Sequence, residues 1–281
     1  MRKLLLLIFY SFLFIDFLFS QAPGIEWQNT IGGSSTDELR SIHQTSDGGY
    51  ILGGYSFSGV SGDKTELNIG GYDYWVVKLN SSGVILWQNT IGGNSFETLY
   101  SIQQTSDGGY ILGGSSFSGI SGDKTEASLG GYDYWVIKLN SSGAIVWQNT
   151  IGGSSDDFLR SIQQTSDAEY ILGGYSYSGV SGDKTDASLG GYDYWVIKLN
   201  SSGAIVWQNT IGGSESDLLN SIQQTSDGEY ILGGYSYSGV SGDKTEANLG
   251  YADYWVVKVN SSGSIVWQNT IGGSESDLLN S

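Results

Sequence analysis

Residues 87–93 read WQNTIGG, and this heptapeptide decides the fold because it recurs at a fixed interval. Its other copies stand at 27–33, 147–153, 207–213 and 267–273, so each period is 60 residues long. A phrase repeated at such a spacing indicates one structural unit built several times, whereas a catalytic centre needs its residues only once. Four periods run through, and a fifth is cut off at Ser281.

Each period predicts four short β-strands. Near 73–80, 84–91, 98–105 and 109–116, runs rich in Ile, Val, Tyr, Trp and Thr are bounded by Gly, Asn, Asp and Ser. The connections at 46–49 and 80–83 have the size and residue types of hairpin turns, which make neighbouring strands antiparallel. Both faces of the strand at 73–80 are largely apolar, and Lys78 is expected to extend its amine out at an edge.

Sheets with two apolar faces, repeated along a chain, stack around an axis as propeller blades. The predicted fold class is therefore all-β, a β-propeller of four-stranded antiparallel blades with four full 60-residue repeats and a truncated fifth. We expect residues 21–281 to form this repeat domain, with periods starting near 27, 87, 147, 207 and 267. We also expect it to be a fragment of a longer propeller.

The N-terminus predicts export. Arg2 and Lys3 precede an apolar run over 4–15, and Ser20 offers a small residue for cleavage, which is the layout of a secretory signal peptide over 1–20. An uncleaved anchor is the alternative. The mature chain has no cysteine and no further apolar run long enough to span a membrane, so we expect it to be secreted or held at the cell surface. The net charge of −17 disfavours nucleic acid and anionic membranes as partners.

The stretch DYWVVKLNSSGVILWQNTIGGNSFETLYSIQQTSDGGYILGGSSFS, residues 73–118, resembles the bacterial seven-bladed β-propeller (SBBP-type) repeat. The resemblance covers residues 25–281 and implies an exported protein of Bacteroidetes-like bacteria. It implies no common catalytic residues. The tryptophans are interpreted as blade framework, because each ring buries about 150–250 Å² between neighbours, with sugar stacking at Trp87 and its equivalents as the alternative. These framework residues are Trp27, Trp75, Trp87, Trp135, Trp147, Trp195, Trp207, Trp255 and Trp267.

No asymmetric reactive cluster stands out in the sequence. His43 is the only histidine, its equivalents at 103, 163 and 223 are Gln, and the G-x-S-x-G pattern does not occur. Paired carboxylates recur in like environments in every period, whereas acid–base chemistry needs two unlike ones. We therefore predict no enzymatic activity, no catalytic residues and no required cofactor. Oxygen-rich loops leave calcium as a cofactor candidate, with the candidate ligands Asp63, Glu66, Asp123, Glu126, Asp183, Asp186, Asp243 and Glu246.

Alternate connections of a meander emerge on the same side, so the variable link at 32–38 and the long loop at 59–72 should share one face. Varied loops on a repeated scaffold usually carry binding. The predicted binding residues on this face are Asp37, Glu38, Asp63, Asp123, Asp157, Asp183, Asp217 and Asp243. The leading hypothesis is a binding or adhesion module for an extracellular glycan or protein. The alternatives are spacer repeats of a larger surface protein and a secreted hydrolase or lyase.

Overall fold

A computed structural model describes residues 24–280, which contain sixteen strands in four sheets and no helix. The first sheet contains β1 (Asp37–Gln44), β2 (Tyr50–Ser56), β3 (Asp73–Leu79) and β4 (Ile85–Ile91). The second contains β5 (Glu97–Gln104), β6 (Tyr110–Ser116), β7 (Asp133–Leu139) and β8 (Ile145–Ile151). The third contains β9 (Asp157–Gln164), β10 (Tyr170–Ser176), β11 (Asp193–Leu199) and β12 (Ile205–Ile211). The fourth contains β13 (Asp217–Gln224), β14 (Tyr230–Ser236), β15 (Asp253–Val259) and β16 (Ile265–Ile271).

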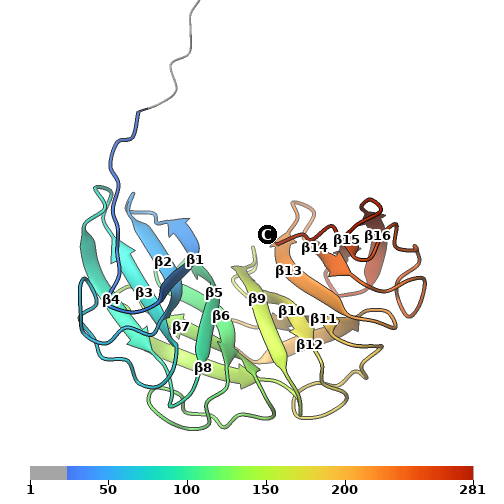
Figure 1. Cartoon of the computed structure of the whole chain (residues 1–281), viewed down its shortest axis with the longest axis horizontal. Coiled ribbons are helices and arrows are strands. Elements are labelled where there is room, and N and C mark those ends of the chain that lie inside the picture. The colour runs from blue at the N-terminus through green and yellow to red at the C-terminus, as the bar shows by residue number, and fades with distance from the viewer. Residues whose placement is uncertain (1–23, 281) are drawn as a thin grey trace, which may run out of the picture.

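Each sheet is an antiparallel meander in chain order, so the predicted all-β fold of four-stranded blades is confirmed. The four blades stand side by side in an arc that is open between the first and the fourth blade (Figure 1). The first strands of successive blades, β1, β5, β9 and β13, contact one another and line the inside of the arc. The predicted signal peptide over 1–20 lies outside the described residues.

The hairpin turns and the long loops emerge at opposite ends of each blade, as the meander requires. We call the end with the long loops 57–72, 117–132, 177–192 and 237–252 the loop face, and the other end the turn face. The links between blades, such as 92–96, also belong to the loop face.

Two residues of WQNTIGG join each blade to the next one. Trp87 packs edge-on against Tyr110 of the second blade, with ring centroids 5.7 Å apart. The Asn89 side chain donates a hydrogen bond to the Gly143 carbonyl oxygen at 2.5 Å. The same pair of contacts recurs at the later blade junctions, which is why the sequence returns to these letters.

The other polar residues of the motif tie the outer strand to its own blade. Gln88 accepts a hydrogen bond from the Trp75 indole at 3.1 Å and donates to the Asp63 carbonyl oxygen at 2.6 Å. Thr90 accepts a hydrogen bond from the buried Lys64 ammonium at 2.7 Å. WQNTIGG therefore recurs because its residues contact both the long loop of their own blade and the next blade.

The core lies between blades. Tyr74 packs on Trp135 of the following blade, at 5.0 Å between ring centroids, and its hydroxyl donates to the Trp135 carbonyl oxygen at 3.1 Å. Both residues are fully buried. The expectation that Lys78 reaches out at an edge is wrong, because β3 is an inner strand. Lys78 is 3% exposed, and its ammonium pairs with Asp47 in the neighbouring hairpin turn at 2.9 Å.

Paired glycines in the second strand of each blade make room in two directions. A Cβ on Gly53 would meet Leu99 and Ile102 of the next blade at 2.8 and 2.9 Å. A Cβ on Gly54 would overlap the Glu38 carbonyl of the adjacent strand. There the pairing of β1 with β2 shifts register between Leu39 and Ser41, so Arg40 is the extra residue of a β-bulge.

The first hairpin turn of the third blade has an alanine where the other three blades have a glycine. Ala168 has a φ of 62°, whereas the same place holds Gly48, Gly108 and Gly228 in the other blades. A left-handed backbone costs a residue with a Cβ about 1 kcal/mol relative to glycine. We therefore expect Ala168→Gly to raise the free energy of unfolding by about 0.5–1 kcal/mol, measured by urea denaturation. The matched reverse change, Gly108→Ala, should lower it by a similar amount, since a Cβ there meets no atom within 4 Å.

Candidate functional site at the loop face

The bulge in the first strand of each blade places a non-repeated side chain inside the arc. The register shift occurs at Arg40, Tyr100, Arg160 and Asn220, and bulges commonly redirect side chains toward sites. These four side chains line a cavity of about 450 Å³. Its remaining lining residues are Leu39, Tyr175, Tyr235 and Asn280. We call this cavity the channel site.

The two arginines are held differently. Arg40 pairs with Glu38 at 2.6 Å and donates to the Tyr55 hydroxyl at 2.5 Å. Arg160 makes no ion pair with any residue in 24–280. Its guanidinium lies over the Tyr100 ring at 4.0 Å from the centroid, and it donates to the Tyr175 hydroxyl. Arg160 is therefore a positive charge held by aromatic groups and not neutralised by a carboxylate.

Arg40 and Arg160 differ from the lysines of the described residues, which do not line the channel site. The lysines of the long loops, Lys64, Lys124, Lys184 and Lys244, are 1–2% exposed and donate to backbone carbonyl oxygens. Those of the third strands, Lys78, Lys138, Lys198 and Lys258, pair with acidic residues in the turns between the first and second strands of each blade.

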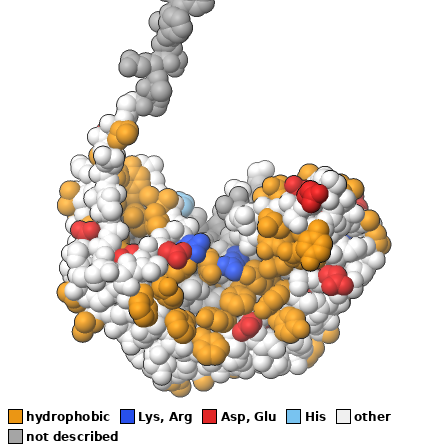
Figure 2. All heavy atoms as spheres, in the orientation of Figure 1, with side chains coloured by type: hydrophobic (Ala, Val, Ile, Leu, Met, Phe, Trp, Pro, Cys, Tyr) orange, Lys and Arg blue, Asp and Glu red, His pale blue; other side chains and the backbone are white. Residues whose placement is uncertain are grey.

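Burial raises the pKa of Tyr55 and Tyr235 above the usual phenol value, so these hydroxyls stay neutral at neutral pH. Figure 2 shows Lys and Arg side chains in the hollow of the arc, with hydrophobic side chains around it.

Aromatic side chains surround the channel site on the loop face. Tyr72 contacts Tyr55 and Phe96, at 5.2 and 6.1 Å between centroids, and thereby links the first blade to the second. A cavity of about 340 Å³ is lined by these three rings and Tyr132, together with Glu38 and Thr98. Further clusters include Phe117, Phe158, Tyr177, Tyr192, Tyr237 and Tyr251. Several of these rings are exposed, with Phe96 at 44% and Tyr177 at 55%.

Several predicted binding carboxylates lie in the interior. Asp157 and Asp217 are 0% exposed, and each accepts a hydrogen bond from the amide of a nearby glycine and from a serine hydroxyl. Asp37 makes the same contacts in the first blade, with Gly33 and Ser58. The structure thus gives these carboxylates a structural role, holding the link between blades. Of the predicted set, Glu38 alone lines the aromatic cavity of about 340 Å³ beside Tyr72.

The calcium candidates accept hydrogen bonds from backbone amides. Asp123 accepts from Gly92 at 3.1 Å, and Glu126 accepts from Thr150 at 2.5 Å. The repeat gives Asp63, Glu66, Asp183, Asp186, Asp243 and Glu246 equivalent contacts. Within residues 24–280, no group of three or more His, Cys, Asp or Glu is arranged to hold a metal ion. The structure therefore does not bring the predicted ligands together as a calcium site.

The framework tryptophans form two sets. Trp135, Trp195 and Trp255 are fully buried between blades, and Trp75 is 7% exposed. Trp87, Trp147 and Trp207 lie toward the outside of the blade junctions and are partly buried. Trp27 and Trp267, at the two ends of the arc, are 36% and 45% exposed. His43 is exposed near the turn face, away from the channel site.

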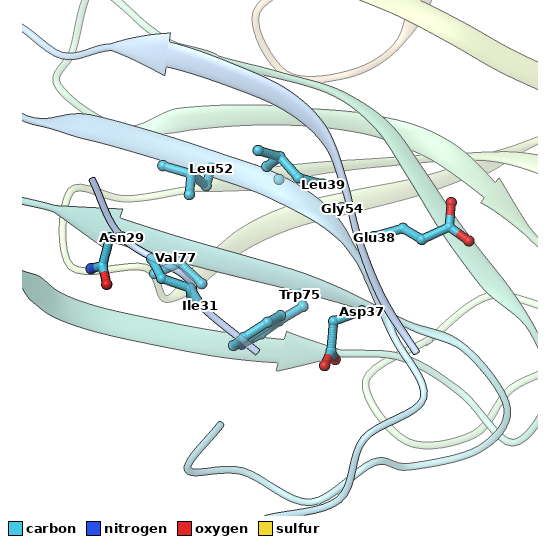
Figure 3. A pocket seen from close by; sticks show the side chains of 10 residues that line it. Asn29, Ile31, Asp37, Glu38, Leu39, Leu52, Gly54, Trp75 and Val77 are labelled. Atoms are coloured by element: carbon cyan, nitrogen blue, oxygen red, sulfur yellow. The ribbon is translucent and has the colours of Figure 1, made fainter. Parts of the chain in front are cut away.

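A further cavity of about 240 Å³ lies between residues 29–31 and the free face of β1, β2 and β3, at the open end of the arc. Figure 3 shows it between the segment carrying Ile31 and the side chains of Leu39, Leu52 and Val77. In the second blade, the residue equivalent to Leu39 is Leu99, which is 0% exposed because it packs on the preceding blade. The cavity therefore reflects the open end of the arc, and we assign it no ligand.

The sequence contained the signal for the channel site, although the prediction missed it. Leu39 is repeated in every period, but the residue that follows this leucine varies. It is Arg40, Tyr100, Arg160, Asn220 and Asn280 in the successive copies. The two arginines of the described chain both stand at this position. The variable segments were recognised, but only their acidic residues were assigned to binding.

No protein-family model and no curated protein matches the chain. Among solved structures, two Synechocystis apocarotenoid oxygenase mutants are similar at 12% identity, with TM-scores of 0.43 and 0.44. A chimera of an apocarotenoid oxygenase and RPE65 is similar at 14% identity, with a TM-score of 0.43. Each match covers 86% of this chain and only 51% of the other chain.

One prediction is corrected by these structures. The chain was predicted to have no enzymatic activity, but two of the solved structures that are similar to it are of an enzyme, an apocarotenoid oxygenase. The exclusion of catalysis is therefore withdrawn. With TM-scores below 0.5, the similarity carries no argument for any particular reaction in this chain.

Proposed function

We propose that this protein is an extracellular carbohydrate-binding module that holds a glycan on its loop face, across the channel site. The observation that carries the proposal is the aromatic cavity of about 340 Å³ beside the channel site. Export through residues 1–20 and membership of the SBBP-type repeat family remain predictions. Among residues 24–280, no helix is long and apolar enough to cross a membrane.

The chemistry of the loop face suits sugar rings. Tyrosine and phenylalanine rings offer flat apolar surfaces for the C–H faces of a pyranose, and tyrosine hydroxyls offer a polar edge. Asn220, Asn280 and Glu38 add donors and acceptors for sugar hydroxyls. A concave site that combines aromatic walls with a few fixed polar groups is the usual form of a ligand pocket.

A substitution taken from the chain's own repeats tests the proposal. Phe96→Ser replaces an exposed ring by the residue found at the equivalent positions 216 and 276, so the fold should tolerate it. We expect binding to immobilised glycans to weaken about three- to tenfold, because one aromatic contact contributes about 0.5–1.5 kcal/mol. Glycan-array screening followed by titration of the best binder measures this change.

Val84→Ala is the matched control, because it introduces the residue of positions 144 and 204 at an exposed site on the turn face. It should leave glycan affinity unchanged. If the folded protein binds no glycan on a broad array, the proposal fails and the spacer alternative gains support. Equal losses in both variants would place binding outside the loop face.

A further inference from the structure

We infer that the channel site recognises the carboxylate groups of an acidic glycan, and that Arg160 is the principal contact. This inference rests on the proposed carbohydrate-binding function and names the substrate class of the same site. In a chain with a net charge of −17, both arginines of the described residues converge on one cavity. The Tyr100 ring lies beside both guanidinium groups, at 5.6 Å from Arg40 and 4.0 Å from Arg160.

Arg160 is the better anchor of the two because its blade lacks the carboxylate that neutralises Arg40. The residue equivalent to Glu38 in the third blade is Phe158, which lies 5.8 Å from the Arg160 guanidinium. The Arg160 Nε–H is buried and has no acceptor among the described residues. A guanidinium held by aromatic rings keeps its charge and its planar array of donors, which matches the two oxygens of a carboxylate.

Asparagine amides and tyrosine hydroxyls complete the lining of this cavity. These neutral groups can bond the ring hydroxyls next to a sugar carboxylate without adding competing charge. Glu38 is the acidic residue of the neighbouring aromatic cavity, and it already accepts a hydrogen bond from Arg40 at 2.6 Å. A ligand carboxylate would compete with Glu38 for Arg40, whereas it meets no such competitor at Arg160.

The chain again supplies the variants that test the inference. Arg160→Asn introduces the residue of positions 220 and 280, and Glu38→Thr introduces that of position 98. The probes are polygalacturonate and alginate, each compared with its carboxyl-reduced neutral form, and dextran sulfate compared with dextran. We expect at least one uronate polymer to bind about 10- to 100-fold more tightly than its neutral form, as a charge-assisted pair predicts.

Arg160→Asn should abolish this preference, because it should weaken uronate binding far more than binding of the neutral forms, and Arg160→Lys should retain only part of the preference. Glu38→Thr should strengthen uronate binding by releasing Arg40. A preference that survives Arg160→Asn overturns the inference, as does binding to neither uronate polymer. Equal, Arg160-dependent binding of dextran sulfate overturns the assignment to carboxylates. If Phe96→Ser weakens neutral glycans but Arg160→Asn changes nothing, the inference fails while the proposed function stands.

Discussion

Gly174→Ala is expected to destabilise the protein by about 3 kcal/mol or more. A Cβ at this position would overlap the carbonyl oxygen of Phe158 in the adjacent strand and would lie 2.6 Å from the Tyr134 hydroxyl. The overlapping partner is backbone, so it cannot rotate away, and overpacking against it forces the β-bulge at Arg160 to open. Chemical denaturation monitored by tryptophan fluorescence should show a lower midpoint than for the parent protein.

Gly179→Ala is the control for this change. It lies five residues further along, its φ is not positive, and a Cβ there meets no atom within 4 Å. It should leave stability unchanged or raise it by about 0.4–1 kcal/mol, because alanine restricts the unfolded chain. If the two variants have equal stability, the second glycine of YILGG is not required by close packing.

The repeat predicted the strands, hairpins and faces because these depend on local pattern. The strand predicted near 84–91 is observed as Ile85–Ile91, and that near 109–116 as Tyr110–Ser116. Such elements are determined by turn residues and alternating apolar positions that lie within a few residues of one another in the sequence. The period then implies that every blade repeats them.

The candidate site was harder to predict because it depends on contacts between blades. Burial of Asp157 follows from the fold of a link onto the preceding blade, and nothing in the letters SSDDFLR distinguishes it from the partly exposed Asp156. Likewise, a one-residue bulge turns Arg160 into the channel, whereas a regular strand would have alternated differently. A sequence pattern of period two does not reveal where that extra residue falls.

Buried carboxylates lie close together at the blade junctions, and they should make the stability of the fold depend on pH. Asp73 at the start of β3 and Glu97 at the start of β5 are both 0% exposed and repel each other across the first junction. Asp133 and Asp157 repeat the arrangement at the second junction. Burial is the largest cause that raises the pKa of Asp73, Asp157 and Asp217 to about 6.

Stability should therefore rise as the pH falls from 7.5 to 5. The folded chain takes up protons at these carboxyls near pH 6, whereas the unfolded chain takes them up only near its ordinary aspartate pKa of about 3.9. Each of the three carboxyls should contribute on the order of 2 kcal/mol, fully present below the unfolded pKa and lost as the pH rises through about 6. The opposite effect, at the exposed Asp107, begins only at more acidic pH, because hydrogen bonds from the Thr105 hydroxyl and the Lys138 ammonium lower the Asp107 pKa to about 2. Urea denaturation at pH 5, 6 and 7.5 measures the change, and Asp157→Asn should make the free energy of unfolding depend less steeply on pH between 5 and 7.5. Stability that is flat or increases from pH 5 to pH 7.5 would show that these carboxyls are ionised in the folded protein without cost, and that the blade junctions are more polar than the structure describes.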